Sequence, residues 1–320
     1  MENLAAIVGH VRTEMSKVVV GQREVADQLL LVILAGGHAV VEGVPGLAKT
    51  MAVKALARIC GLGFQRVQCT ADLMPADVTG TNVFNLATSS FHLHRGPVFT
   101  DLLLVDEINR TAPRTQAALL EAMEERQVTI DGVRYPLHEN FTVLATQNPV
   151  EFEGTYPLPE AQLDRFLLKI RILYPTAEDE VEILSRHGAG FDARLLDQLA
   201  LAPIGPELLA AARREITQVT VEPNIYSYIV AVIRRTRDWP SVSLGASPRA
   251  AVGLVLTARA FAAMGGSDSE PRDSLLPDDV KAVALPVLRH RLLLKPEADL
   301  EGLTTDQVIL QILATVEVPQ

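Results

Sequence analysis

The chain has few cysteines, no long apolar run and no excess of basic residues, and each absence excludes a class of protein. Two cysteines in 320 residues, Cys60 and Cys69, are too few for a disulfide framework and lack metal-ligand spacing, so they favour a reducing compartment. The longest apolar run, residues 29–35, is far shorter than the ~18 residues that a membrane-spanning helix needs. The first residues also lack the basic region and cleavage site of a signal peptide. We therefore expect a cytoplasmic protein without an integral membrane segment.

The charge balance is acidic. Lys and Arg number 29 against 39 Asp and Glu, which gives a formal net charge of −10. Proteins that bind a nucleic-acid backbone usually present an excess of Lys and Arg to its phosphates, so we expect no nucleic-acid partner. A hydrophobic content of 48% in 320 residues allows two domains, each with its own core.

Residues 43–50 read GVPGLAKT, and this octet predicts binding of a nucleoside triphosphate. It follows the apolar residues 38–41 and precedes a run with helical character at 51–58. A strand, a glycine-rich turn and a helix in this order direct backbone N–H groups and the positive helix end toward one point. In this arrangement Lys49 reaches the β- and γ-phosphates, and the Thr50 hydroxyl is a ligand for Mg²⁺.

Ala48 departs from the strict form of this motif, which has glycine at that position. Alanine costs nothing there if the backbone is helical, but it is strained if φ is positive. A chance glycine-rich helix start is the alternative interpretation of the octet.

Residues 102–107, LLLVDE, have the form of a buried parallel strand that ends in two carboxylates. Ligands of open α/β sheets bind at the carboxyl ends of the strands. We expect Asp106 to hold Mg²⁺ through water, and Glu107 to orient and deprotonate the attacking water. A solvated acidic turn is the alternative.

A further strand is predicted at residues 141–146, and Asn148 follows its end. This amide can donate to a γ-phosphate or to the attacking water. Without the two preceding motifs, Asn148 before proline would be a common turn residue.

Strands are predicted to alternate with helices in the first half of the chain, which favours βαβ units and a parallel sheet. The predicted strands are residues 39–42, 64–69, 102–106, 141–146 and 166–172, with a helix at 113–126. A β-hairpin with an Asp-Gly turn is predicted at 128–135, and residues 91–94 are strand-like. His92 and His94 share a face of that strand, but solvated positions fit them better than a metal site.

The pattern becomes helical after residue 175. Thr176 is predicted to cap a helix, with Asp179 completing a capping box. Further helices are predicted at residues 206–218, 225–238, 248–264, 277–288 and 306–316.

Taken together, these residues resemble the MoxR-type AAA+ ATPases from about residue 15 to 300. The resemblance is carried by VGQ at 20–22, GVPGLAKT at 43–50, LLLVDEINR at 102–110, ATQNP at 145–149, LPEAQLDRF at 158–166, GASPRA at 245–250 and VLRHRLLLKPEA at 287–298. It implies an α/β fold with a P-loop AAA+ parallel-sheet core of strand order 5-1-4-3-2, followed by an all-α lid domain. The implied core is residues 1–175, with a helix-2 insert and a hairpin before sensor 1, and the implied lid is residues 176–320.

Two arginines gain roles from this resemblance. Arg165 is implied to be the arginine finger that reaches the γ-phosphate of a neighbouring subunit; a structural pair with Asp164 or Glu160 is the alternative. Arg249, in the first turn after Ser247, is implied to be the sensor 2 arginine that contacts the nucleotide of its own subunit. A first-turn cation is unfavourable at a positive helix end, which favours a functional role. The resemblance implies that the basic run 289–291 lies against the next subunit or the lid core. A solvated charged face is the alternative.

The resemblance further implies that Val20 and Gly21 pack against adenine. The predicted contacts to ATP are Val20, Gly21, Gly43, Val44, Pro45, Gly46, Leu47, Ala48, Lys49, Thr50 and Asp106, and the predicted catalytic residues are Glu107, Asn148, Arg165 and Arg249. The implied protein is an ATP hydrolase in a homo-oligomeric ring, a hexamer, that remodels or matures a client protein. Metal-cofactor insertion is one such task, and a von Willebrand factor A-domain protein is the implied partner. A magnesium-chelatase-like subunit, a nucleic-acid motor and an ATP-gated assembly scaffold remain alternatives.

Overall fold

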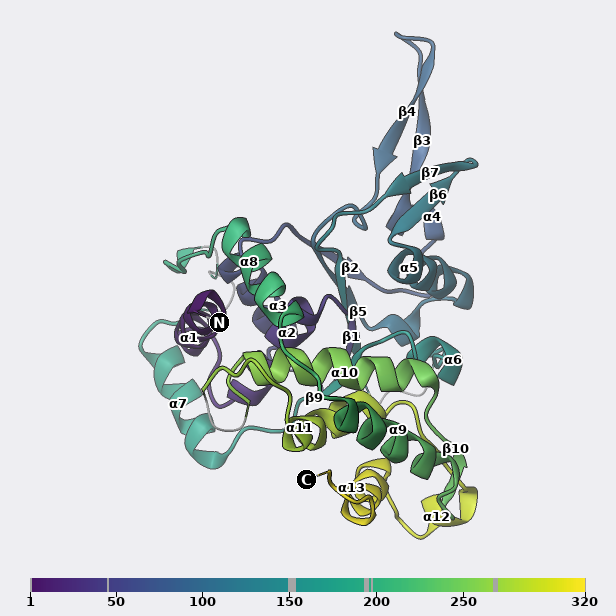
Figure 1. Cartoon of the computed structure of the whole chain (residues 1–320). Helices are drawn as coiled ribbons and strands as arrows, with labels where there is room; N and C mark the ends of the chain where they lie inside the picture. Colours follow the sequence, from purple (N-terminus) through teal and green to yellow (C-terminus); the bar gives the residue numbers. More distant parts are fainter. Residues whose placement is uncertain are drawn as a thin grey trace.

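A five-stranded parallel sheet forms the centre of the molecule (Figure 1). The computed structural model describes residues 2–44, 46–148, 154–192, 196, 198–266 and 270–319, so Pro45, a predicted nucleotide contact, lies outside the described residues. The strand order is β2-β5-β8-β1-β9, with β1 at Ala39–Glu42, β2 at Phe64–Gln68, β5 at Leu102–Asp106, β8 at Thr142–Gln147 and β9 at Leu168–Arg171. Counted along the chain as core strands one to five, this is the predicted order 5-1-4-3-2.

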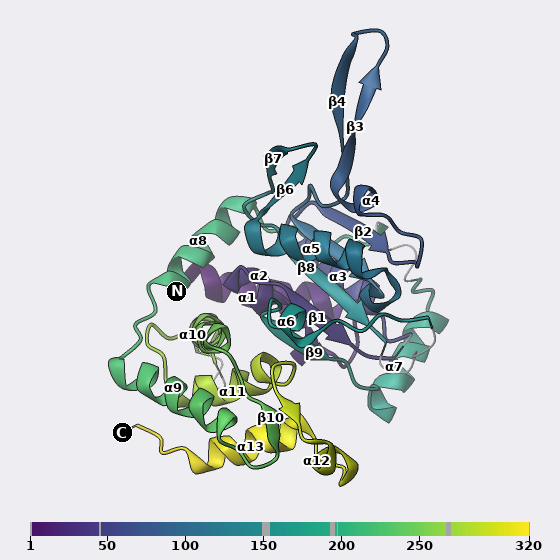
Figure 2. The same ribbon diagram turned by 90° about the vertical axis from the view of Figure 1, so that its right-hand side faces the viewer.

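Side chains of the central strands alternate between two apolar cores, one on each face of the sheet. Leu102 and Leu104 of β5 enter one core, and Leu103 and Val105 enter the other. The helices α2 (Arg23–Ala35) and α3 (Lys49–Ile59) cover the first face, and α5 (Pro113–Glu125) covers the second (Figures 1 and 2). Burial on both faces explains why these strands read as continuous apolar runs.

Two hairpins project from one end of the sheet (Figure 1). The longer pairs β3 (Gly80–Asn85) with β4 (Ser90–Arg95), and the shorter pairs β6 (Gln127–Ile130) with β7 (Val133–Pro136). The shorter one turns at Asp131 and Gly132, with φ of 50° and 80°, as the predicted Asp-Gly turn requires. Asn82 Nδ2 donates to Asp131 Oδ2 at 2.8 Å, which joins the turn of the shorter hairpin to the base of the longer one. In the described part of the chain no three His, Cys, Asp or Glu residues come together as a metal site.

The second half of the chain is mainly helical. Its helices are α6 (Glu160–Leu163), α7 (Ala177–Gly188), α8 (Pro206–Thr217), α9 (Pro223–Arg237), α10 (Pro248–Ala263), α11 (Pro277–Leu288), α12 (Pro296–Leu300) and α13 (Thr305–Thr315). The predicted capping box at the start of α7 is present, with Thr176 Oγ1 accepting from the Asp179 N–H at 3.2 Å. A small antiparallel pair, β10 (Val242–Leu244) with β11 (Leu293–Leu294), was not predicted, because such short strands show no alternation.

The apolar core on the α2 side runs without interruption from the first helix, α1 (Glu2–Ser16), into the lid helices. The helix α10 packs against α2 as well as against α9 and α11, and α8 packs against α1. Separately, none of the helices that the structure describes is long and apolar enough to cross a membrane.

Candidate active site

The loop after β1 is shaped for a phosphate and carries backbone strain. Gly46 has φ of 85°, and Ala48, directly before α3, has φ of 55° and ψ of 22°. Ala48 is therefore in the left-handed region, the strained one of the two possibilities left open by the sequence, at a cost of roughly 1–2 kcal/mol for an L-residue. Strain of this kind is maintained at functional sites by the surrounding structure.

A cavity of about 470 Å³ lies over this loop. Its walls are residues 46–51, together with Asp106 and Glu107 at the end of β5 and Thr146 and Asn148 at the end of β8. The fold thus brings the three predicted motifs to one place. Lys49 Nζ donates across the loop to the carbonyl of Gly43 at 2.5 Å, so the ammonium group lies over the turn that would receive the phosphates.

The carboxylate of Asp106 is held by three side chains. Its Oδ1 accepts from Thr146 Oγ1 at 2.6 Å, and its Oδ2 accepts from Thr50 Oγ1 at 3.3 Å. The same Oδ2 accepts from Arg66 of β2, at 2.6 Å from Nη2 and 3.1 Å from Nε. Asp106 and Thr50, the predicted Mg²⁺ ligands, are therefore adjacent, and a guanidinium lies beside them.

Glu107 also has a left-handed backbone, with φ of 59° and ψ of 52°. Its N–H donates to Thr146 Oγ1 at 2.8 Å, so this hydroxyl connects the backbone of Glu107 to the carboxylate of Asp106. Glu107 Oε2 accepts from Gln68 Nε2 at 3.1 Å and from Arg110 Nη1 at 3.0 Å. The side chain of the predicted base is thus fixed by β2 and by the turn after β5.

Arg66, Gln68 and Thr146 were not predicted from the sequence. The only available signal was the polar character of β2, FQRVQ, in a strand next to β5. In a parallel sheet the ends of neighbouring strands lie together, so polar residues late in β2 reach the acids that end β5.

The turn that contains Val20 and Gly21 lies beside the phosphate loop. Gln22 Nε2 is 3.5 Å from the Leu47 carbonyl, and Gly21 has φ of 70°. A Cβ on Gly21 would lie 2.3 Å from the carboxylate carbon of Asp179 and would displace that side chain, while the positive φ itself favours glycine. A cavity of about 540 Å³ between α1 and α2 is lined by Gly21 and Gln22, among others. Of the two adenine contacts that the resemblance implies, Gly21 lines this cavity, whereas Val20 is not among its lining residues.

Arg165 and Arg249 lie together, away from the phosphate loop of their own chain. Arg165 Nη2 is 3.0 Å from Glu124 Oε2, and Arg249 Nη2 is 2.6 Å from Glu124 Oε1. Glu124 is near the end of α5, and Arg126, two residues later, donates to the carbonyl of Gly36 before β1. The phosphate loop follows the end of β1, whereas Gly36 precedes its start, so the arginines lie toward the opposite end of the strands. Arg249, which the resemblance implies to contact the nucleotide of its own subunit, thus binds Glu124 in this structure and does not lie at the phosphate loop of the same chain.

In the basic run 289–291, His290 and Arg291 are buried and bind the segment that carries Arg165, whereas Arg289 binds Asp306. Arg291 Nε donates to Asp164 Oδ1 at 2.7 Å, and its Nη2 donates to the Phe166 carbonyl at 2.7 Å. His290 Nε2 lies 2.9 Å from the same carbonyl, and burial lowers the pKa of His290 well below 6.5. Ser247 Oγ, at the start of α10, donates to Asp164 Oδ2 at 2.8 Å. The solvated-face interpretation of this run is therefore wrong, and Asp164 pairs with the lid instead of with Arg165.

The sheet order, the phosphate loop and the two acids after β5 define a P-loop ATPase with a helical lid. Residues 38–168 match the model of the ATPase family associated with various cellular activities (AAA), and residues 234–312 match the AAA lid domain. The chain belongs to the MoxR family of AAA+ ATPases, and it is an ATP hydrolase.

Full-length relatives support this assignment. YeaC from Bacillus subtilis is 43% identical, over 99% of this chain and 97% of that protein. Chaperone MoxR1 from Mycobacterium tuberculosis is 40% identical, over 96% of this chain and 81% of that protein. A crystal structure of a candidate ATPase from Cytophaga hutchinsonii, 40% identical, has a TM-score of 0.88 and covers 99% of this chain and 96% of its own.

Proposed function

We propose that the protein is a Mg²⁺-dependent ATPase whose active sites are completed between neighbouring copies in a homo-oligomeric ring, a hexamer. The observation that carries this proposal is the separation of Lys49 and Thr50 from Arg165 and Arg249, which lie toward opposite ends of the strands of one sheet. A nucleotide at the loop of one chain can meet such arginines only if another chain supplies them. Both Arg165 and Arg249 would then act on the neighbour's nucleotide.

Each residue of the loop cavity has a role in this proposal. Lys49 exchanges the Gly43 carbonyl for the β- and γ-phosphates, and Asn148 donates to the γ-phosphate or the attacking water. Glu107 orients that water and takes its proton once its carboxylate is released by Gln68 and Arg110. The two guanidiniums of the neighbour neutralise charge that develops on the γ-phosphate, a contribution of roughly 10³–10⁵ in rate in related phosphoryl-transfer enzymes.

The donors beside the loop fit Mg²⁺. The Thr50 hydroxyl and the Asp106 carboxylate are hard oxygen ligands 3.3 Å apart, and the cavity leaves room for water and phosphate oxygens around them. When bound, the ion would be held by Thr50 and Asp106 and would offset the negative charge of the polyphosphate. Val20, Gly21, Gly43, Val44 and residues 46–48 would enclose the base and the polyphosphate.

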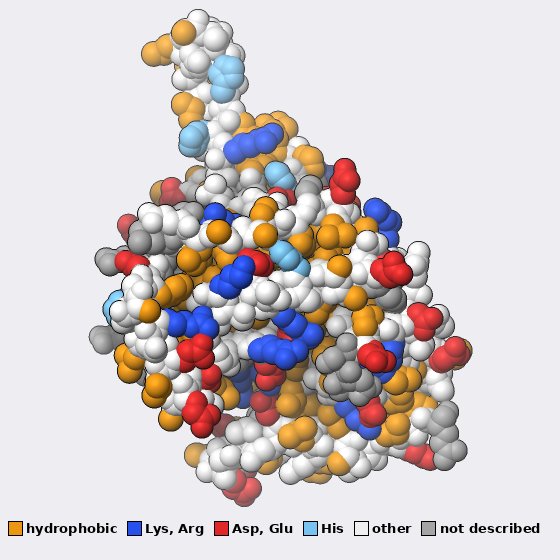
Figure 3. Space-filling model, turned by 90° about the vertical axis from the view of Figure 1, so that its left-hand side faces the viewer, with side chains coloured by type: hydrophobic (Ala, Val, Ile, Leu, Met, Phe, Trp, Pro, Cys, Tyr) orange, Lys and Arg blue, Asp and Glu red, His pale blue; other side chains and the backbone are white. Residues whose placement is uncertain are grey.

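The work done by hydrolysis is proposed from the hairpins and from the name of one relative. Apolar side chains are exposed on the β3–β4 hairpin, where Leu86 is 85% and Phe91 69% exposed, and the rings of Phe84 and Phe91 pack edge to face at 5.1 Å. Figure 3 shows hydrophobic and histidine side chains on the projecting hairpin. We propose that this hairpin contacts a client protein, in chaperone-like remodelling of the kind that the name of MoxR1 indicates.

The proposal also includes a partner protein, a task and a cellular compartment. A von Willebrand factor A-domain protein is the proposed partner, and maturation of a metal-containing client is the proposed task. The two thiols, Cys60 and Cys69, are free and buried, and burial raises the pKa of each to about 12, which suits a reducing cytoplasm. No nucleic-acid partner is proposed, since the net charge is −10 and the face in Figure 3 carries acidic and basic side chains side by side.

The decisive experiment measures ATP turnover per chain against protein concentration in the presence of Mg²⁺. Turnover that rises and then saturates in the range where sizing shows assembly would support sites between chains. Turnover that stays constant down to monomer concentrations would exclude them. A mixture of Arg165→Ala with Lys49→Ala should recover activity, because hybrid interfaces combine an intact loop with an intact arginine.

A further inference from the structure

Glu124 joins two arginines that come from distant parts of the chain. Arg165 lies between α6 and β9, and Arg249 lies in the first turn of α10, yet both bind this one carboxylate near the end of α5. Each arginine uses a different carboxylate oxygen, at 3.0 Å and 2.6 Å. The three side chains and Met123 line a cavity of about 180 Å³. Core and lid therefore meet at Glu124.

Two guanidiniums this close repel each other unless an anion lies between them. Glu124 supplies that anion and leaves the cluster with a net charge of plus one. Each guanidinium is bound to Glu124 through Nη2, and within the described residues no other ion pair engages either arginine. The side chains are 31% exposed for Arg165 and 47% for Arg249, so their remaining N–H groups are accessible to an incoming anion.

Hydrogen bonds to Asp164 fix the backbone segments that carry Arg165 and Arg249. Asp164 accepts from Ser247, which caps α10, and from the buried Arg291. These bonds set the distance between the segment before β9 and the start of α10. Glu124 then sets the direction of the two flexible side chains that extend from them.

We infer that Glu124 is a positioning residue, which gathers Arg165 and Arg249 into one anion-binding unit for the polyphosphate of a neighbouring chain. The inference rests on the proposed function, because it takes the active site to lie between chains. Glu124 itself touches no substrate. Its removal separates the guanidiniums and weakens catalysis at the neighbour's site, while the nucleotide cavity of its own chain is unchanged.

The first test compares Glu124→Ala, Glu124→Gln and Glu124→Asp with Glu125→Ala, an exposed acid next in sequence. A shift of about 1 Å in a catalytic group costs up to roughly 100-fold in rate, so kcat should fall by roughly 10- to 100-fold in the Ala and Gln variants. KM and the affinity for a fluorescent ATP analogue should stay within about twofold, since the loop is untouched. Glu124→Asp should regain part of the loss, and Glu125→Ala should match the parent protein. Unchanged or increased kcat in Glu124→Ala would overturn the inference.

Mixing experiments separate this inference from the proposed function. Glu124→Ala mixed with Lys49→Ala should recover activity. At a hybrid interface, the first variant supplies an intact phosphate loop and the second supplies an intact pair of Arg165 and Arg249. Glu124→Ala mixed with Arg165→Ala should recover none, because both lack the same half of the site. If Arg165→Ala with Lys49→Ala also fails in demonstrably mixed assemblies, the proposed function itself fails. If that control succeeds and Glu124→Ala gains nothing from Lys49→Ala, only the role of Glu124 is refuted.

Discussion

Arg66 and Asp106 form a two-pronged ion pair beside the phosphate loop, with Nη2 and Nε of the arginine at 2.6 and 3.1 Å from one carboxylate oxygen. Thr50 donates to that same oxygen. The pair places a positive charge of the protein where the proposed Mg²⁺ would meet its carboxylate. Arg66 is 46% exposed, so it can leave Asp106 without disturbing the core.

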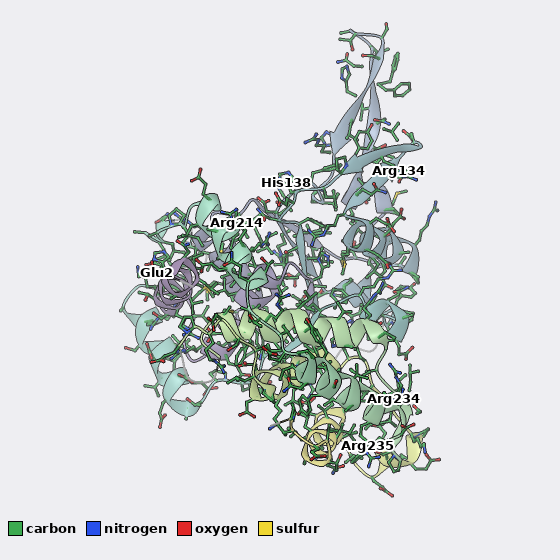
Figure 4. All side chains as sticks on the ribbon, viewed as in Figure 1. Glu2, Arg134, His138, Arg214, Arg234 and Arg235 are labelled. Atoms are coloured by element: carbon green, nitrogen blue, oxygen red, sulfur yellow. The ribbon has the colours of Figure 1, made fainter. Side chains whose placement is uncertain are left out.

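Replacing Arg66 by glutamine should lower the Mg²⁺ concentration needed for tight nucleotide binding, because the competing cation is gone. An exposed pair of this kind is worth about 0.2–1 kcal/mol, which corresponds to a shift of up to about fivefold. Titration of a fluorescent ATP analogue with Mg²⁺ measures this shift. Arg134→Gln, on the projecting β7 (Figure 4), is the matched control. A higher Mg²⁺ requirement in Arg66→Gln would show that Arg66 assists the metal instead of competing with it.

Glu107→Gln should bind ATP with unchanged affinity and lose turnover. The amide fits the same space and its oxygen can still accept from Arg110, but it cannot take a proton from water. General-base catalysis contributes roughly 10²–10⁴-fold, so a loss in that range is expected in single-turnover hydrolysis. Hydrolysis at the parent rate would remove Glu107 from the role of base.

Ala48→Gly should stabilise the protein without nucleotide by about 0.5–1 kcal/mol, because glycine removes the strain of the left-handed backbone. Part of the gain is offset by the greater freedom of glycine in the unfolded chain. Urea unfolding of the two proteins gives the difference. Ala48→Val is the counterpart, and it should destabilise the protein because a β-branched residue is poorly accommodated at positive φ. Equal stability of all three proteins would contradict the backbone geometry described for the loop.

The free energy of unfolding should fall as pH drops below about 6.5, because of His38. Burial lowers its pKa from 6.5 to about 4, and its Nδ1 accepts from the Val143 N–H at 2.9 Å, which requires the neutral ring. The unfolded chain takes up a proton near pH 6.5 and the folded chain only near pH 4, so stability is lost across that window, by about 3 kcal/mol. Chemical unfolding across this window measures the slope. His38→Asn should reduce the slope and leave the part that the buried His290 contributes, whereas the exposed His94→Asn should leave the slope unchanged.

Arg291→Met should destabilise the protein by about 3–5 kcal/mol, because it leaves the Asp164 carboxylate without its buried partner. The exposed Arg234→Met on α9 (Figure 4) should change stability by about 0.5 kcal/mol or less. Thermal and chemical unfolding compare the two. Similar stabilities would mean that the lid does not depend on Asp164.

The sequence predicted what depends on neighbours along the chain. The strands β1 and β5 and the helix α11 begin and end at the predicted residues, because apolar runs, proline starts and glycine turns mark them locally. The loop and the two acids were found for the same reason. Contacts between distant positions were missed. Arg66 is 40 positions from Asp106, and Arg249 is 125 positions from Glu124, and only the folded chain brings them together.

The sequence left the surroundings of residues 289–291 open between the lid core, the next subunit and a solvated face. Three consecutive basic residues resemble a solvated surface, and their partners, Asp164 and backbone carbonyls near β9, become apparent only when α11 is packed against β9. The short β10–β11 pair was not predicted, because strands of two or three residues are too short to show an alternating pattern of apolar and polar residues.

If active sites form between chains, the separation of the phosphate loop from the arginine pair makes the number of complete sites depend on whether the assembly is open or closed. Under the proposed arrangement every chain offers one half-site on each of two faces, so an open row always has an unused half at each end. Closing the row joins those two halves and adds one complete site without adding a chain. Activity per chain would thus report whether the assembly is open or closed, before any client is bound.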